Sequence, residues 1–285
     1  MGRGWLVGSL RRPGEGFSWV GGAQNAFAGI VMDRSLDHLG LQAALRRQEP
    51  ATDPIVSALS TPAGAAALET LSPTLRAWWT VRDRWFDRVL RRLIMPGHAR
   101  VMWLGAGLDP SPLRWPPGLL GEGSLWLVDR PDVLDARAER LAAAGLSDPA
   151  CARFVQDDPI GSDRWLSVLH EQAPNDGVPL RVLVTGLAPF WSMDRLQHVA
   201  QGLMALPHQR LFVGFDWFGP GLRGLDAPMV QALGAAGAPF GLDRLGLEMI
   251  WRALGADRID TEAILSHGAR EVGMVTLVQR IGAPR

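Results

Sequence analysis

The chain has 285 residues, 47% of them hydrophobic and 20% charged, and its formal net charge is zero. This length suits one large α/β domain with decorations. The balanced charge argues against a nucleic-acid surface or a polybasic membrane patch. The single cysteine, Cys151, excludes an intramolecular disulfide and a cysteine-rich zinc site, and we expect no metal. No apolar run has the length of a signal peptide or a membrane span, which favours a cytoplasmic protein.

The first third of the chain predicts helices ahead of the main domain. Residues 1–35 are glycine-rich with scattered aromatics, which fits either a poorly ordered tail or an arm over a pocket. Leucines over 36–45 suggest one helix, and Asp53 followed by Pro54 predicts the start of another. The apolar spacing over 72–95 is that of an amphipathic helix. We therefore predict an N-terminal cap over 1–75 and a main domain over 76–285.

Alternating strands and helices follow in the main domain. Short apolar runs predict strands at 101–104, 125–128, 153–156, 180–184 and 211–215, and helical patterns over 132–145, 162–172 and 192–206 connect the later ones. This rhythm predicts parallel βαβ units.

The end of the chain breaks this rhythm. Residues 217–246 are rich in Gly, Pro and apolar side chains and indicate an insertion, followed by a helix over 243–254. The segments 258–265 and 271–278 are so closely connected that they must pair antiparallel. We therefore predict an α/β fold with a Rossmann-like, seven-stranded sheet, mostly parallel with an antiparallel C-terminal hairpin. That is the architecture of class I methyltransferases, and a dehydrogenase would not be expected to end this way.

A glycine turn and a carboxylate suggest a nucleoside site. The strand at 101–104 ends at Gly105 and Gly107, where the missing Cβ allows a sharp turn and close approach of a ligand. The next strand ends in Asp129, and a carboxylate in this position is the usual device for binding ribose hydroxyls. The alternative is a tight turn with no ligand.

The residues after the turn favour one kind of nucleotide. The dinucleotide fingerprint requires a third glycine where this chain has Pro110, and Pro112 follows. The two prolines argue against a helix that starts directly on a pyrophosphate. We therefore expect an adenosyl group without a diphosphate, which indicates S-adenosylmethionine rather than NAD.

Three blocks of the sequence carry a family resemblance. They are RDRWFD at 82–87, LGAGLD at 104–109 with Arg114 after it, and VDRPDV at 128–133. Together they are similar to the leucine carboxyl methyltransferase family, particularly to its bacterial O-methyltransferases of polyketide and other secondary-metabolite pathways. Residues 41–59 also look like the N-terminal helices of that family, so the resemblance covers about residues 41–280.

The resemblance implies a cofactor site for S-adenosyl-L-methionine. By position, Arg82 would pair with the methionine carboxylate, for which a guanidinium is well shaped. Gly105 and Gly107 would admit the cofactor, and Asp129 would bind its ribose. One of the acidic pair Asp157 and Asp158 would bind the adenine amino group, and we favour Asp158.

One position departs from the family pattern. After the fourth strand the family has a glutamate that faces the methionine end of the cofactor, and a tyrosine five residues later. Here these are Thr185 and Phe190. A threonine can still form a hydrogen bond, but it cannot pair with an ammonium group. We expect weaker cofactor binding, a reshaped acceptor site, or a relative that has lost catalysis.

The acceptor site is less defined by the sequence. We expect its walls in the N-terminal arm, the loop 186–191 and the insertion. Substrate-contact candidates are Phe190, Trp191, Trp217 and Arg223, although each of these tryptophans could equally be a core aromatic and the arginine a surface residue. A carboxylate acceptor would need no general base, whereas a hydroxyl would. None of the six histidines has a partner that identifies it as that base, so no catalytic residue is assigned.

Three functions remain open at this point. The first is an O-methyltransferase acting on a small or peptide-like metabolite, with no nucleic-acid or membrane partner and with a homodimer as one oligomeric state. The second is a non-catalytic relative that binds the cofactor or a partner protein, which Thr185 favours. The third is a nicotinamide-dependent oxidoreductase, which Pro110 and the terminal hairpin disfavour.

Overall fold

The sheet contains seven strands. The computed structural model describes residues 53–70, 73–93, 99–115, 120, 124–173, 176–208, 210–222, 230, 242–267 and 270–282. The strands are β1 Arg100–Leu104, β2 Leu125–Asp129, β3 Ala152–Gln156, β4 Leu180–Val184, β5 Arg210–Phe218, β6 Arg258–His267 and β7 Arg270–Ile281. Their order across the sheet is β3-β2-β1-β4-β5-β7-β6. The first five strands are parallel, while β7 is antiparallel to both β5 and β6, so the predicted fold class is confirmed.

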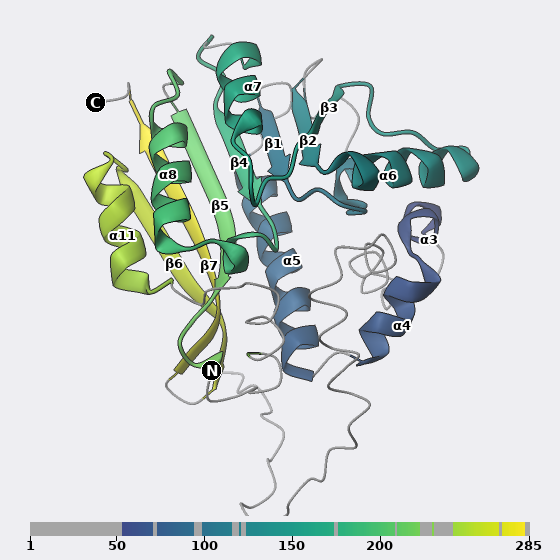
Figure 1. Cartoon of the computed structure of the whole chain (residues 1–285), viewed down its shortest axis with the longest axis horizontal. Helices are drawn as coiled ribbons and strands as arrows, with labels where there is room; N and C mark the ends of the chain where they lie inside the picture. Colours follow the sequence, from purple (N-terminus) through teal and green to yellow (C-terminus); the bar gives the residue numbers. More distant parts are fainter. Residues whose placement is uncertain are drawn as a thin grey trace, which may run out of the picture.

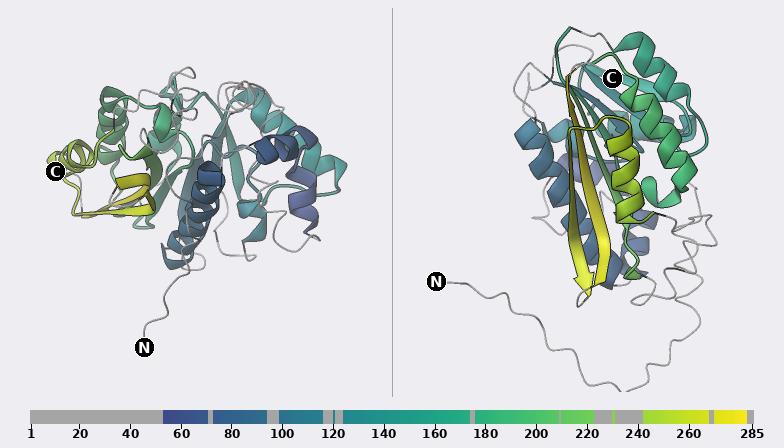
Figure 2. Two further views of the ribbon diagram at one scale, coloured as in Figure 1. Left: turned by 90° about the horizontal axis from the view of Figure 1, so that it is seen from below. Right: turned by 90° about the vertical axis from the view of Figure 1, so that its left-hand side faces the viewer.

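Helices cover both faces of this sheet (Figures 1 and 2). The helices that the structure describes are α3 Pro54–Leu59, α4 Pro62–Thr70, α5 Pro73–Leu93, α6 Pro131–Ala143, α7 Arg164–Gln172, α8 Met193–Met204 and α11 Arg244–Ala253, with 3-10 turns η2 Ser111–Arg114 and η3 Ala188–Phe190. On one face α5 and α6 pack in the core with Val101 and Trp103. On the other face α7, α8 and α11 pack in the core with Met102 and Leu104. Alternate residues of β1 thus supply the two cores, as a strand buried on both sides requires.

Two of the described helices before β1, α3 and α5, are predicted by the sequence, whereas α4 is not. Asp53 caps α3, its carboxylate accepting the backbone N–H of Ile55 at 2.9 Å. Helix α3 lies against α6, where the Arg140 side chain donates to the carbonyl groups of Ala58 and Ser60 at 3.1 and 2.8 Å. The predicted domain boundary after residue 75 falls within α5, so the two parts share a helix. The predicted arm over 1–35 and the helix over 36–45 lie outside the described residues.

The fifth strand is longer than predicted. The sequence predicts its end at Phe215, but β5 continues to Phe218 because Asp216, Trp217 and Phe218 pair with β7. The insertion therefore does not begin at 217. Gly273 in β7 has no side chain and leaves space for Trp78 of α5. The ring centroids of Trp78 and Phe218 are 4.4 Å apart. None of the helices in the described ranges has the length and apolar character needed to cross a membrane.

Candidate functional site

The glycine turn lies at the boundary between β1 and β4, where the strand order reverses. Gly105 and Gly107 have φ of 70° and 49°, a conformation that glycine adopts without strain. A Cβ on Gly105 would lie 2.9 Å from the Leu187 Cγ atom and 3.1 Å from the carbonyl oxygen of Thr185. Ligands of open α/β sheets bind at such reversal points, outside the carboxyl ends of the strands. The absence of a side chain at Gly105 therefore lets the loop after β4 pack closely against this turn.

Asp129 connects the end of β2 to the glycine turn. Its carboxylate accepts the backbone N–H of Gly107 at 2.8 Å and that of Arg130 at 2.9 Å. Burial raises the pKa of Asp129 to about 6, although both N–H donors oppose this shift. The structure thus brings Gly105, Gly107 and Asp129 together, with the carboxylate held by backbone donors.

Arg137 supports this turn and is not apparent as a site residue in the sequence. It lies on α6 with no exposed surface. Its guanidinium donates to the carbonyl oxygens of Gly107 and Asp109 at 3.1 and 2.8 Å, and it pairs with Asp148 at 2.7 Å. The sequence feature that could have identified Arg137 is its position on the same side of the helix as the buried Leu134 and Leu141. A charged residue on a buried stripe predicts a specific partner.

The two acidic residues after β3 have different roles in the structure. Asp157 is buried, and its carboxylate accepts the backbone N–H of Trp165 at 2.9 Å, which ties it to the start of α7. Asp158 is half-buried and accepts the N–H of Ile160 at 3.1 Å. Asp158 therefore has the more accessible carboxylate, and its role at adenine stays a prediction.

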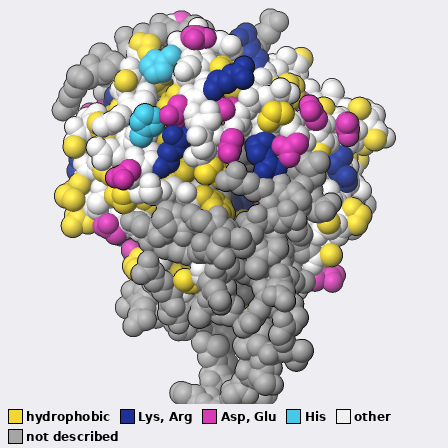
Figure 3. All heavy atoms as spheres, viewed as in Figure 1, with side chains coloured by type: hydrophobic (Ala, Val, Ile, Leu, Met, Phe, Trp, Pro, Cys, Tyr) yellow, Lys and Arg dark blue, Asp and Glu magenta, His cyan; other side chains and the backbone are white. Residues whose placement is uncertain are grey.

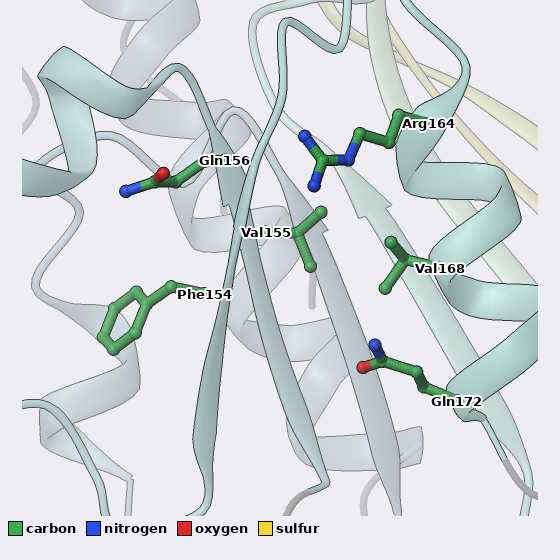
Figure 4. Close-up of a pocket in the computed structure, with 6 residues that line it drawn as sticks. All are labelled: Phe154, Val155, Gln156, Arg164, Val168 and Gln172. Atoms are coloured by element: carbon green, nitrogen blue, oxygen red, sulfur yellow. The ribbon is translucent and has the colours of Figure 1, made fainter.

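A hollow runs beside these residues along the edge strand (Figure 4). In the close-up, Val155 points toward α7 while Phe154 and Gln156 point to the opposite side of β3. The hollow is lined by Phe154, Val155, Gln156, Arg164, Val168 and Gln172. Neither Asp157 nor Asp158 is among these lining residues.

A second group of charges lies at the ends of β4 and β5. Arg82 of α5 is buried, and its Nε and Nη2 atoms donate to Asp83 at 3.1 and 2.9 Å. Its Nη1 atom lies 3.8 Å from a carboxylate oxygen of Asp216. The other oxygen of Asp216 accepts the backbone N–H of Gly186 at 2.7 Å. Helix α5 thus places Arg82 beside the loop that follows β4, and Asp216 is a site residue that sequence analysis missed.

Thr185 forms a side-chain hydrogen bond within the sheet. It is buried, and its hydroxyl accepts the indole N–H of Trp103 at 2.9 Å. This bond joins the ends of β4 and β1 on the face that α5 covers. The threonine therefore has a defined partner in the sheet.

Two of the predicted substrate contacts are core residues instead. Trp191 and Trp217 are 1% and 0% exposed and belong to the core between the sheet and α7, α8 and α11. Trp217 lies in β5, where its indole N–H donates to the Thr276 hydroxyl at 3.0 Å. The prediction fails for both because the extension of β5 and the turn before α8 bury them. Phe190 is half-buried in η3, and Arg223 lies outside the described residues.

Comparison with known proteins places the chain among methyltransferases. The family model described as leucine carboxyl methyltransferase matches residues 29–204. A provisionally named S-adenosyl-L-methionine-dependent methyltransferase of Parafrankia sp. is 30% identical over 154 residues, which is 53% of this chain and 48% of the relative. A relative of the same description in Mycobacterium tuberculosis is 31% identical over 137 residues, 47% of this chain and 43% of its own. The chain therefore spans about half the length of the curated relatives it matches.

Solved structures agree on the fold. A provisionally named methyltransferase from Thermobifida fusca has a TM-score of 0.54 at 17% identity, covering 80% of this chain and 94% of its own. A duf574 family protein from Streptomyces avermitilis has a TM-score of 0.53 at 14% identity, covering 84% and 96%. At such identities the likeness concerns the fold alone. The family model matches more than half of the residues of this chain, so the chain belongs to the leucine carboxyl methyltransferase family.

Proposed function

We propose that this protein is an S-adenosyl-L-methionine-dependent O-methyltransferase that acts on a carboxylate or hydroxyl of a small or peptide-like metabolite in secondary metabolism. The observation that carries the proposal is the Asp129 carboxylate, held by the Gly107 N–H at 2.8 Å where the strand order reverses. This is the position at which such sheets bind ribose. The cofactor is carried over from the names of the relatives in Parafrankia and Mycobacterium.

The residues at the strand ends fit an adenosyl group with an amino-acid tail. Asp129 can accept two ribose hydroxyl groups, and the backbone of Gly107 has open space on its Cα side, where a Cβ would lie 3.9 Å from the Gly105 carbonyl oxygen and meet nothing else within 4 Å. Asp158 is the expected partner of the adenine amino group. At the other end, the Arg82 guanidinium suits a carboxylate. The glycine turn carries no third glycine for a diphosphate, which disfavours a dinucleotide.

Methyl transfer from this cofactor is a displacement in which the sulfonium supplies the methyl group. The protein's contribution is alignment of the two reactants and exclusion of water. A carboxylate acceptor is already ionised at neutral pH and needs no base. Of the histidines in the described ranges, His198 bonds to Asp163 at 2.8 Å on the surface and His208 is buried, so neither of these two suits that role.

A second candidate function is a cofactor- or protein-binding module without catalysis. It is favoured by Thr185, which stands in place of the family's glutamate, has no charge to pair with an ammonium group, and has a hydroxyl that already accepts the Trp103 indole N–H. Binding of S-adenosylhomocysteine without detectable methyl transfer to any acceptor tested would support this candidate.

The first test is calorimetric titration with S-adenosylhomocysteine and, separately, with NAD. We expect micromolar binding of the first ligand and none of the second. Asp129→Asn should weaken binding at least about tenfold, because an amide accepts fewer hydroxyl hydrogen bonds than a carboxylate. The matched control is Asp132→Asn, an exposed position in the first turn of α6. Binding of NAD alone would instead revive the oxidoreductase hypothesis.

The surface is consistent with a small-molecule substrate. On the face seen in Figure 3, acidic and basic side chains of the described residues are interspersed, in keeping with the zero net charge. A protein that binds a polyanion usually gathers basic residues on one face.

A further inference from the structure

The Asp216 carboxylate is a fully buried charged group at the candidate site. It is 0% exposed and lies in the part of β5 that extends beyond the predicted strand. One oxygen accepts the Gly186 N–H at 2.7 Å. The other, Oδ2, has no hydrogen-bond partner among the described residues, and Arg82 Nη1 is 3.8 Å away. A buried carboxylate oxygen without a hydrogen bond is costly, so it indicates a missing partner.

Among the described residues, Asp216 shares its nearest cation, Arg82, with a second carboxylate, Asp83. Arg82 contributes one positive charge, and Asp83 and Asp216 contribute one negative charge each. Asp83 already accepts two hydrogen bonds from Arg82. Burial raises the pKa of Asp216 to about 6, against the opposing effect of Arg82. A cationic group of a ligand would complete this cluster and would be favoured by it.

The position of Asp216 relates it to the family's missing glutamate. The residue in that glutamate's place is Thr185, which is bound to Trp103. Asp216 accepts the backbone N–H of the very next residue, Gly186. A carboxylate is therefore present within one residue of the family position, supplied by the neighbouring strand.

We propose that Asp216 receives the ammonium group of the cofactor's amino-acid end, while Arg82 receives its carboxylate. An α-amino acid carries its ammonium and carboxylate groups on the same carbon. The Arg82 guanidinium and the Asp216 carboxylate have the complementary charges and lie 3.8 Å apart. This inference rests on the proposed function, because it assumes that the cofactor's amino-acid end lies at the ends of β4 and β5. It makes Asp216 a cofactor-binding residue that replaces the glutamate absent at Thr185.

The test compares two ligands on three proteins. The ligands are S-adenosylhomocysteine and its analogue that lacks the amino group. The proteins are the wild type, Asp216→Asn and the control Asp176→Asn, whose carboxylate pairs with Arg100 at the opposite end of the strands. We expect the wild type and the control to prefer the amino ligand about 10- to 100-fold, as is typical of a charged hydrogen bond. In Asp216→Asn this preference should fall below about threefold.

Each outcome decides a different claim. A wild type that binds both ligands equally overturns the inference, and so does an Asp216→Asn protein that keeps the full preference. In both of these cases the proposed function stands, because S-adenosylhomocysteine still binds. A folded wild type that does not bind it at all contradicts the proposed function itself.

A second measurement covers the case in which Asp216→Asn does not fold. The preference of the wild type is measured at pH 8 and at pH 5.5. The charged groups that face Asp216 among the described residues are Arg82 and Asp83 of α5. Asp129 also titrates near this range, but it faces the ribose that both ligands share, so its effect cancels in the ratio. The preference should fall at least about threefold at pH 5.5, and an unchanged preference overturns the inference.

Discussion

The two ends of the candidate site are built differently. At the ends of β1 and β2, the Asp129 carboxylate accepts two backbone N–H groups. One belongs to the adjacent residue, Arg130, and the other to Gly107 in the turn after β1. At the ends of β4 and β5, Asp216 has one backbone donor and otherwise meets Arg82, which comes from a helix far earlier in the chain. Each oxygen of the first carboxylate thus already accepts one backbone N–H and has a lone pair left for a ribose hydroxyl. The second retains an oxygen with no hydrogen bond among the described residues, so its geometry points to a charged ligand group.

The largest effect is expected from removing Arg82. Arg82→Ala would leave Asp83 and Asp216 buried without their cation and would remove the partner of the cofactor carboxylate. We expect binding of S-adenosylhomocysteine to fall at least about 100-fold by titration. The control is Arg84→Ala, an exposed position on the same helix. If Arg82→Ala bound S-adenosylhomocysteine within a few-fold of the wild-type affinity, Arg82 would not be part of the cofactor site.

The next effect concerns the glycine turn. Gly105 and Gly145 have nearly the same φ, 70° and 68°, but a Cβ would meet Leu187 at 2.9 Å at the first and nothing within 4 Å at the second. Both alanine substitutions should lose about 1 kcal/mol of unfolding free energy from the backbone conformation. Gly105→Ala should lose about 1–2 kcal/mol more from crowding, together with ligand binding. If chemical denaturation showed equal losses of unfolding free energy for the two variants, the contact between residue 105 and Leu187 would have no effect on stability.

The third effect is a pH dependence of stability. For a carboxyl whose pKa is raised on folding, the folded state is favoured at low pH, and this advantage is lost as the pH rises from about 4 to about 6. Asp216→Asn should therefore stabilise the ligand-free protein at pH 7.5, by up to about 3 kcal/mol. Its difference from the wild type should vanish near pH 4. A variant that is less stable than the wild type at pH 7.5 would contradict the assignment of an uncompensated charge.

The smallest effect separates the two acids after β3. Asp157→Ala should cost about 1 kcal/mol of stability, because Trp165 loses the acceptor for its N–H at the start of α7. Asp158→Ala should leave stability nearly unchanged and weaken binding of S-adenosylhomocysteine about five- to tenfold. The two are measured side by side by thermal unfolding and titration. The reverse pattern would assign the adenine to Asp157.

Most of the fold was predictable because its signals are local. The strands β1, β2 and β4 are short apolar runs that are almost completely buried, so their limits could be read to within one or two residues. The edge strand β3 is mostly exposed, and its end is marked by the acidic pair that follows it. The end of β5 could not be read this way. Its last residues are added by pairing with β7, which lies about 60 residues later, and no local pattern carries that information.

The candidate site likewise contains residues that local sequence patterns identify and residues that only tertiary packing brings to it. Gly105, Gly107 and Asp129 could be predicted because a glycine turn and a strand-end carboxylate have a recognisable spacing. Asp216 and Arg137 could not, since their partners are brought to them by the packing of α5 and α6. Trp191 and Trp217 were assigned to an acceptor site because aromatic side chains favour binding surfaces and cores alike, and only burial distinguishes the two.

The most direct measurement is a crystal structure of the protein with S-adenosylhomocysteine bound. Our account predicts that the ribose hydroxyl groups bond to Asp129 and that the amino-acid end lies at Arg82, with its ammonium group within hydrogen-bond distance of Asp216. A ligand that occupies the glycine turn but directs its amino-acid end away from β5 would contradict the role of Asp216. A ligand bound elsewhere would contradict the site as a whole.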